Sequence, residues 1–220
     1  GWSETAEIVE AFAAYEAFRA GRPTAARQRG RAAKASVAPE ARKTEARTPP
    51  VIAADDWAFC KSSLEEVSRT FSRPIALLPG RLEIAVSLGY LLCRIADTIE
   101  DHPAVGADIR GDLFRTFLEI LEGDRDPSDL TKGFDPVPGD DAELVLARAM
   151  PTVMRVFRAQ SPSTIAISTR WVCEMARGMD LYTRRQPQED GFLALYTVSD
   201  LDRYCYYVAG TVGHMLTELF

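Results

Sequence analysis

The stretch AVSLGYLLCRIADTIED, residues 85–101, carries two opposite faces on one predicted helix. At 100° per residue, the apolar face consists of Leu88, Leu92, Ile95 and Ile99. The polar face on the far side consists of Tyr90, Arg94, Asp97 and Asp101. The pattern predicts a helix that packs into a core on one side and leaves the other side free for chemistry.

The acidic residues of this helix have a spacing that suits metal binding. Asp97 and Asp101 are four residues apart, so their carboxylates leave the same face one turn apart. Carboxylate oxygens are ligands that Mg²⁺ prefers. Arg94 lies three residues before Asp97 and points the same way. By spacing alone, the simpler interpretation is a solvated outer face on which Arg94 and Asp97 form an ion pair.

Composition predicts a globular and acidic protein. Of the 220 residues, 46% are hydrophobic and 9% are aromatic, which is enough for a sizeable core. The formal net charge is -6, and residues 51–220 carry 17 Lys and Arg against 26 Asp and Glu, a net charge of -9. This balance argues against a nucleic-acid-binding surface.

The cysteines and the hydropathy pattern indicate a compartment. Four cysteines are spread along the chain without a C-x-x-C pair: Cys60, Cys93, Cys173 and Cys205. We therefore expect reduced core thiols and no zinc site. No apolar run is long enough to span a membrane, and the N-terminus lacks a signal-peptide pattern. A cytoplasmic protein is expected, with contact at a membrane surface left open.

Three regions are predicted along the chain. Residues 1–20 are predicted to form an amphipathic helix of unknown role, and the Ala/Arg/Pro-rich run 21–50 is predicted to be a basic linker. Residues 51–220 are predicted to form an all-α domain, because every clear periodic segment has the helical repeat and none alternates like a strand.

Helix boundaries within this domain follow from caps and periodicity. We expect a helix that starts at Trp57, is capped by Asp56 and ends near Pro74, so that Ser68 to Phe71 form its last turn. The other expected helices cover residues 107–122, 142–157, 165–182 and 202–220. Residues 123–141 are polar and rich in Asp, Pro and Gly, so a mobile connector is expected there.

The last predicted helix has an unusual strip of small residues. Ala209, Gly210 and Gly213 lie next to a face that carries Tyr204 and Val208. Each Gly inside a helix costs about 1 kcal/mol relative to Ala. Either a neighbouring helix comes close to this strip or a bulky ligand occupies the space.

Four motifs together resemble the squalene and phytoene synthase family. They are VSRTF at 67–71, YLLCRIADTIED at 90–101, MARGM at 175–179 and YCYYVAGTVG at 204–213. The resemblance covers roughly residues 57–220, and the second and fourth motifs look most like squalene synthase members. It implies an isoprenoid-synthase helical bundle around a central cavity, of which this chain would be the N-terminal portion.

The resemblance also implies roles for matching residues. Asp97, Asp101 and, less directly, Glu100 would hold Mg²⁺ against the diphosphate of a prenyl substrate. Tyr204 would act in the first half-reaction, together with Tyr90 and Arg94 near the diphosphate. The other implied substrate-binding residues are Ser68 and Arg69 near the diphosphate, Phe71 at the cavity wall, and Met175, Met179, Val208 and Gly210 along the prenyl channel.

The activity implied is head-to-head condensation of two farnesyl diphosphates to presqualene diphosphate, followed by NADPH-dependent reduction to squalene. A phytoene or hopanoid-pathway synthase would share the first half-reaction. A catalytically inactive assembly or lipid-binding relative is the non-enzyme alternative, against which the presence of Asp97, Asp101, Arg69 and Tyr204 argues. A monomer is expected, with peripheral membrane contact for product release.

The family carries a second acidic motif downstream of the YCYYVAG segment. No such motif occurs before Phe220. The sequence-based expectation is that residues 51–220 contain half of the metal site and that residues 1–220 by themselves are inactive.

Overall fold

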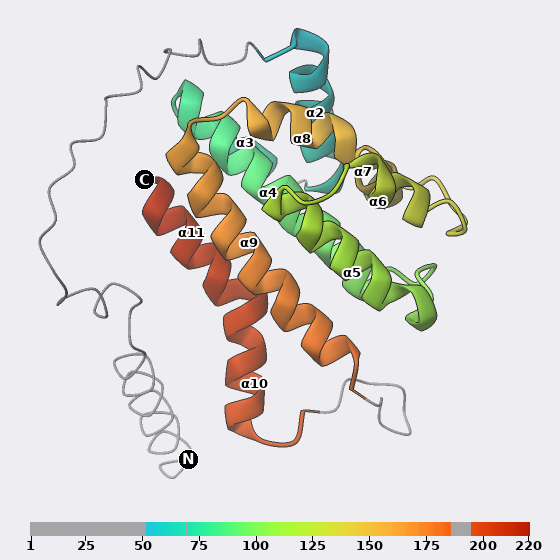
Figure 1. Cartoon of the computed structure of the whole chain (residues 1–220). Helices are drawn as coiled ribbons and strands as arrows, with labels where there is room; N and C mark the ends of the chain where they lie inside the picture. The colour runs from blue at the N-terminus through green and yellow to red at the C-terminus, as the bar shows by residue number, and fades with distance from the viewer. Residues whose placement is uncertain (1–51, 69, 186–194) are drawn as a thin grey trace, which may run out of the picture. The chain divides into compact units, whose positions relative to one another are not determined.

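The computed structural model describes residues 52–68, 70–185 and 195–220, and every regular element in these ranges is a helix (Figure 1). The predicted all-α class is confirmed. The predicted helix 1–20 and linker 21–50 lie outside the described residues. In chain order the elements are α2 (Ala54–Val67), α3 (Ser72–Ile75), α4 (Gly80–Asp101), α5 (Ala107–Glu122), α6 (Ser128–Gly133), α7 (Ala142–Arg148), α8 (Met150–Arg158), α9 (Pro162–Thr183), α10 (Val198–Cys205), the π-helical turn η1 (Tyr206–Gly210) and α11 (Thr211–Leu219).

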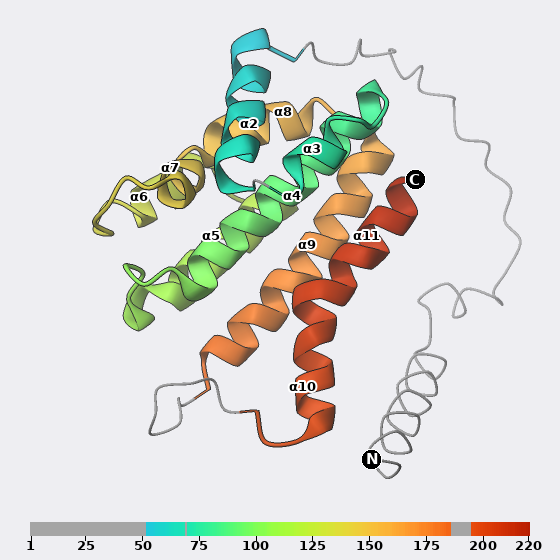
Figure 2. The same cartoon turned by 180° about the vertical axis from the view of Figure 1, so that it is seen from behind.

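Helix α4 is the centre of the bundle. It contacts α2, α5, α7, α8, α9 and α11, and both views show α9 passing beside it with α11 on the outer side of α9 (Figures 1 and 2). The four residues of the predicted apolar face are fully buried, namely Leu88, Leu92, Ile95 and Ile99. Burying each such side chain stabilises the fold by about 1.5–3 kcal/mol. None of the helices in the described ranges is long and apolar enough to cross a membrane.

The first helix of the bundle differs from its predicted boundaries. α2 begins at Ala54, and Asp56 lies in its first turn without capping it. The Asp56 carboxylate instead accepts two hydrogen bonds, of 2.7 and 2.8 Å, from the Arg155 guanidinium of α8. A bidentate pair with a guanidinium is stronger than a single cap bond, so the prediction of an Asp56 cap was wrong.

The same helix also ends earlier than predicted. Its C-cap is Ser68, which has an extended backbone, and Thr70 and Phe71 form a turn before α3, so α2 does not continue to Phe71. The Ser68 hydroxyl, which is buried, accepts a hydrogen bond of 3.1 Å from the Phe71 N–H. A local hydrogen bond to a side chain competes with the backbone hydrogen bonds of a helix, so it favours the end of α2 at this residue.

The expected connector 123–141 is partly ordered. It contains α6, and its apolar residues Leu130, Phe134 and Val137 are buried in the core. The guanidinium of Arg148 donates to the carbonyls of Val137 and Gly139, which holds the chain after α6. The prediction of a mobile connector was wrong here because three spaced apolar residues outweigh a polar composition.

The helix expected over 142–157 is divided into α7 and α8 at Ala149. Pro151 lies in the first turn of α8 and has no N–H to donate to the preceding turn. A proline is tolerated at the start of a helix and not in its interior. The break therefore follows from Pro151, which a helical repeat of apolar residues does not reveal.

The segment 202–220 is helical, but a π-helical turn interrupts it at Tyr206–Gly210. A π turn inserts an extra residue, which rotates the faces on its two sides relative to each other. Thr211 and Met215 are buried, whereas Tyr204 is only half-buried. An uninterrupted α-helix would place Tyr204, Thr211 and Met215 on one face, and the π turn is the reason that they differ in burial.

The strip of small residues is not where another helix comes closest. A Cβ added at Gly213 would meet nothing within 4 Å, and the atoms nearest to one at Gly210 belong to the side chain of Tyr206 in the same turn. The close approach involves Gly178 of α9, where an added Cβ would lie 2.1 Å from Cγ of Tyr207. The neighbouring-helix explanation therefore applies to Gly178 and fails for Gly210 and Gly213.

Candidate active site

The polar face of α4 brings together charged groups from two helices. Arg94 lies between Asp97, at 3.5 Å from Nη1 to Oδ2, and Glu143 of α7, which accepts a short hydrogen bond from Nη2. About a third of each of these three side chains is exposed. The predicted Arg94–Asp97 pair is present, and it belongs to a half-buried cluster that a fully solvated face would not form.

The carboxylates of α4 are crowded. Burial, followed by the nearby Asp101 charge and opposed by Arg94, raises the pKa of Asp97 to about 6. Burial together with Asp97 and Asp101 raises the pKa of Glu100 to about 7. Charged carboxylates that repel one another and are partly desolvated favour a cation between them. This donor set fits Mg²⁺ because it consists of hard oxygen ligands.

Tyr204 reaches this cluster through Glu100. Its hydroxyl donates a hydrogen bond of 3.4 Å to Oε1 of Glu100, which is 104 residues earlier in the chain. Burial, followed by the Glu100 charge, raises the pKa of Tyr204 to about 12, so the phenol is protonated at neutral pH. On an ideal helix Glu100 points about 60° away from Asp97 and about 100° away from Asp101, and Tyr204 approaches from that flank.

Tyr204 is held by a buried tyrosine. The ring of Tyr182, at the end of α9, meets that of Tyr204 edge-on with centroids 5.1 Å apart. The Tyr182 hydroxyl donates to Oδ1 of Asp200 at 3.0 Å, and Arg185 pairs with the same carboxylate. Edge-to-face ring pairs stabilise an arrangement beyond simple burial. The C-terminal end of α9 therefore fixes where Tyr204 can lie.

Four further residues were predicted to lie near the substrate, namely Ser68, Arg69, Phe71 and Tyr90. Tyr90 is half-buried and its ring centroid is 5.8 Å from that of Phe71, which is 56% exposed. Asp101 is exposed. Arg69 lies outside the described residues. The roles of Tyr90, Phe71 and Ser68 in substrate binding stay predictions.

The residues predicted to line a prenyl channel are mostly in the core. Met175 and Met179 are buried among the core side chains, and Val208 packs against that core while half-buried. Gly210 is half-buried in the π turn. Their role as channel residues stays a prediction.

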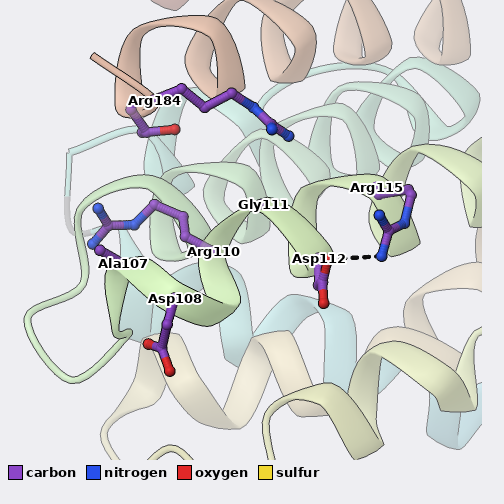
Figure 3. Close-up of a pocket in the computed structure, with 8 residues that line it drawn as sticks. Ala107, Asp108, Arg110, Gly111, Asp112, Arg115 and Arg184 are labelled. Atoms are coloured by element: carbon purple, nitrogen blue, oxygen red, sulfur yellow. Dashed lines mark hydrogen bonds and ion pairs between the residues drawn. The ribbon is translucent and has the colours of Figure 1, made fainter. Parts of the chain in front are cut away.

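A pocket of about 250 Å³ lies elsewhere, between the start of α5 and the end of α9 (Figure 3). Its lining contains none of the predicted site residues. The guanidinium of Arg110 donates to the carbonyls of Ile99 and Val105, and Arg115 pairs with Asp112. Because these cations are already bonded within the chain, we assign the pocket no role.

His102, Asp141 and Glu143 form a second group with ligand atoms within 4.8 Å of one another. The Ala104 N–H donates to Nδ1 of His102, so the ring proton is on Nε2, which faces Oδ2 of Asp141 at 3.2 Å. The other Asp141 oxygen caps α7 by accepting from backbone N–H groups. His102 and Asp141 thus join the end of α4 to the start of α7, so we do not assign a metal site there.

Comparison with known proteins identifies the family. The model of the squalene/phytoene synthase family matches residues 64–220. The chain belongs to the squalene/phytoene synthase family. Squalene synthase BSS of Botryococcus braunii is 33% identical over 167 residues, which are 76% of this chain and 33% of that protein. A presqualene diphosphate synthase of the same organism is 30% identical over 170 residues, 77% of this chain and 38% of that protein.

The fold agrees with the family assignment. A solved structure of TcSQS in complex with a ligand superposes with a TM-score of 0.60 and 28% identity, covering 75% of this chain and 44% of that chain. This chain spans about a third of the length of the curated relatives that it matches. The squalene synthase resemblance and the isoprenoid-synthase type of fold are thereby confirmed.

Glu143 is the site residue that sequence reasoning missed. It lies outside all four family motifs, directly after a segment expected to be a connector. The available signal was Asp141 as a helix N-cap, which would have placed Glu143 in a first turn. No local pattern could have shown that this first turn faces Arg94, which is 49 residues earlier.

The crowded carboxylates predict how stability depends on pH. The pKa values of Asp97 and Glu100 are higher in the folded protein than in the unfolded chain, so the folded state binds more protons between pH 4 and 7. The contribution of these two carboxyl groups to the free energy of unfolding is present below about pH 4 and is lost as the pH rises through 6 and 7. Asp200, whose pKa is lowered to about 2, acts in the opposite direction, but only below about pH 4.

We therefore expect the metal-free protein to have a thermal midpoint at pH 8 that is lower than at pH 5 by at least about 2 °C. A Glu100→Gln variant should show a smaller difference. Thermal unfolding in chelator at both pH values checks this. An equal difference in wild type and Glu100→Gln would mean that Glu100 is not the source.

Proposed function

We propose that the protein catalyses the head-to-head condensation of two farnesyl diphosphates to presqualene diphosphate and its reduction to squalene with NADPH. The single observation that carries the proposal is the cluster on α4, where Arg94, two half-buried carboxylates and the Tyr204 phenol meet. The family assignment and relatives named squalene synthase and presqualene diphosphate synthase support it.

The residues have distinct tasks in this proposal. Asp97, Asp101 and Glu100 would hold Mg²⁺, which when bound supplies the positive charge that an allylic diphosphate needs to depart. Arg94 donates hydrogen bonds to the diphosphate oxygens as negative charge develops on them. Tyr90 and Phe71, with rings 5.8 Å apart, offer aromatic faces to the allylic cation.

Tyr204 would move a proton in this reaction. Its hydroxyl already donates to Glu100, so its oxygen can accept a proton from the cation while its own proton passes to Oε1 of Glu100. The core side chains Met175 and Met179 would exclude water from the prenyl chains.

A reaction that stops at presqualene diphosphate is the second candidate, because one relative is named presqualene diphosphate synthase. A phytoene-type product is covered by the family description. Release of an apolar product would bring the protein to a membrane surface, and we propose peripheral contact there.

Product analysis of the full-length protein tests the proposal. The protein is incubated with farnesyl or geranylgeranyl diphosphate, with and without Mg²⁺ and NADPH. We expect presqualene diphosphate from farnesyl diphosphate and Mg²⁺, and squalene when NADPH is added. Phytoene from geranylgeranyl diphosphate would assign the other branch of the family. No condensation product from either substrate would overturn the proposed activity.

A further inference from the structure

We infer that Glu143 is a positioning residue that shares Arg94 with Asp97 and so keeps the guanidinium directed toward the diphosphate. The inference rests on the proposed function of this cluster. Glu143 accepts the short hydrogen bond from Nη2 of Arg94, whereas Asp97 is 3.5 Å from Nη1. The carboxylate from α7 therefore holds the guanidinium more closely than the one on its own helix.

Glu143 is itself fixed by the start of α7. Oδ1 of Asp141 accepts hydrogen bonds from the N–H groups of Glu143 and Leu144, at 3.2 and 3.1 Å. Oδ2 of Asp141 faces His102, the residue that follows α4. The cap therefore ties the first turn of α7 to the end of α4, and the Glu143 carboxylate stays level with Arg94.

The guanidinium has few other anchors. Nε of Arg94 is buried and finds no hydrogen-bond partner among the described residues. The two terminal nitrogens of Arg94, one bonded to Glu143 and the other near Asp97, therefore determine where the guanidinium lies. A guanidinium held by two carboxylates keeps its plane and the outward N–H groups in one orientation.

Loss of Glu143 would change the balance between these partners. Arg94 would then have Asp97 as its nearest carboxylate, one turn away on the same helix, and the i, i+3 pair would close. A closed pair neutralises Asp97 and turns the Arg94 donors back onto α4. Mg²⁺ and a diphosphate would then each lose part of their site.

The test uses Glu143→Gln, which keeps the shape and removes the charge, in the full-length protein. Glu122→Gln is the matched control, because Glu122 also pairs with an arginine of another helix, Arg177, across 55 residues, and Glu122 itself lies outside all four family motifs. Binding of inorganic pyrophosphate is measured by calorimetry with and without Mg²⁺, beside the thermal midpoint. We expect Glu143→Gln to weaken Mg²⁺-dependent pyrophosphate binding about tenfold. Glu122→Gln should leave binding unchanged, with similar small changes in midpoint for both variants.

A double-mutant cycle shows whether Glu143 acts through Arg94. In an Arg94→Gln background, adding Glu143→Gln should cause no further loss of pyrophosphate binding. An equal loss in both backgrounds, or no loss in either, would overturn the inference. Glu143→Asp, which keeps the charge with a shorter reach, should lie between wild type and Glu143→Gln.

Failure of this inference is distinct from failure of the proposed function. Wild-type protein that forms a condensation product, with Glu143→Gln binding pyrophosphate equally well, rejects only the role of Glu143. Wild-type protein that forms no product from either prenyl diphosphate rejects the proposed function, whatever the variants do.

Discussion

Replacing Asp97 by Asn in the full-length protein is expected to lower turnover about 10² to 10³-fold, the effect of losing a preorganised electrostatic contact of about 3–4 kcal/mol. The substitution keeps the shape of the side chain and removes one negative charge from the proposed Mg²⁺ site. Because that charge holds a cation against an anionic diphosphate, its loss should affect the chemical step and not the fold.

The same variant should not be less stable. The pKa of Asp97 is raised to about 6, so ionising this carboxylate costs folding free energy in the metal-free protein above that pH. Asn at this position avoids that cost, and the thermal midpoint in chelator at pH 8 should stay equal or rise. Added Mg²⁺ should raise the midpoint of wild type more than that of Asp97→Asn.

Asp112→Asn provides the control for a surface ion pair, since Asp112 pairs with Arg115 at 2.7 Å and both side chains are largely exposed. It should leave turnover unchanged and alter stability by at most about 0.5 kcal/mol. Turnover of Asp97→Asn within twofold of wild type would show that the acidic face of α4 takes no part in the chemical step. The metal assignment would then have to be abandoned.

Replacing Gly178 by Ala is expected to destabilise the fold by about 2–3 kcal/mol. The added Cβ would lie 2.1 Å from Cγ and 2.5 Å from Cβ of Tyr207. These atoms are at the base of the side chain, so a rotamer change does not remove the clash and the π turn has to move away from α9. That movement also shifts Tyr204, which lies three residues before Tyr207, so turnover should fall with stability.

Gly213→Ala is the matched control, because a Cβ there meets nothing within 4 Å. Ala favours a helix over Gly by up to about 1 kcal/mol, so this variant should be as stable as wild type or more stable. Chemical denaturation of both variants measures the difference. A Gly178→Ala protein as stable as wild type would mean that α9 and the π turn separate at no cost.

Much of the fold could be predicted because the deciding information is local. The apolar face of α4 follows from a 3.6-residue repeat, and its four residues are buried as expected. Four motifs in order were enough to indicate the family, which the comparisons confirm. The predicted helix over 165–182 corresponds closely to α9, Pro162–Thr183.

The errors occurred where a tertiary contact outweighed a local preference. Asp56 looks like a helix cap in sequence and is instead bound to Arg155, which lies 99 residues later. Residues 128–133 look like part of a polar connector, yet Leu130 within them is fully buried against the core. The π turn at Tyr206–Gly210 leaves no mark in a period of 3.6, because it replaces one register by another within a single turn.

The sequence by itself determined the class of fold, the family and the polar face of α4, since each depends on residues that are close in the chain. Only the tertiary structure decided which groups meet that face. Glu143 reaches Arg94 across 49 residues and Tyr204 reaches Glu100 across 104, through the packing of helices whose relative positions no helical repeat encodes. The physical reason is that periodicity determines which side of a helix is buried, whereas partners across helices depend on how the whole bundle packs.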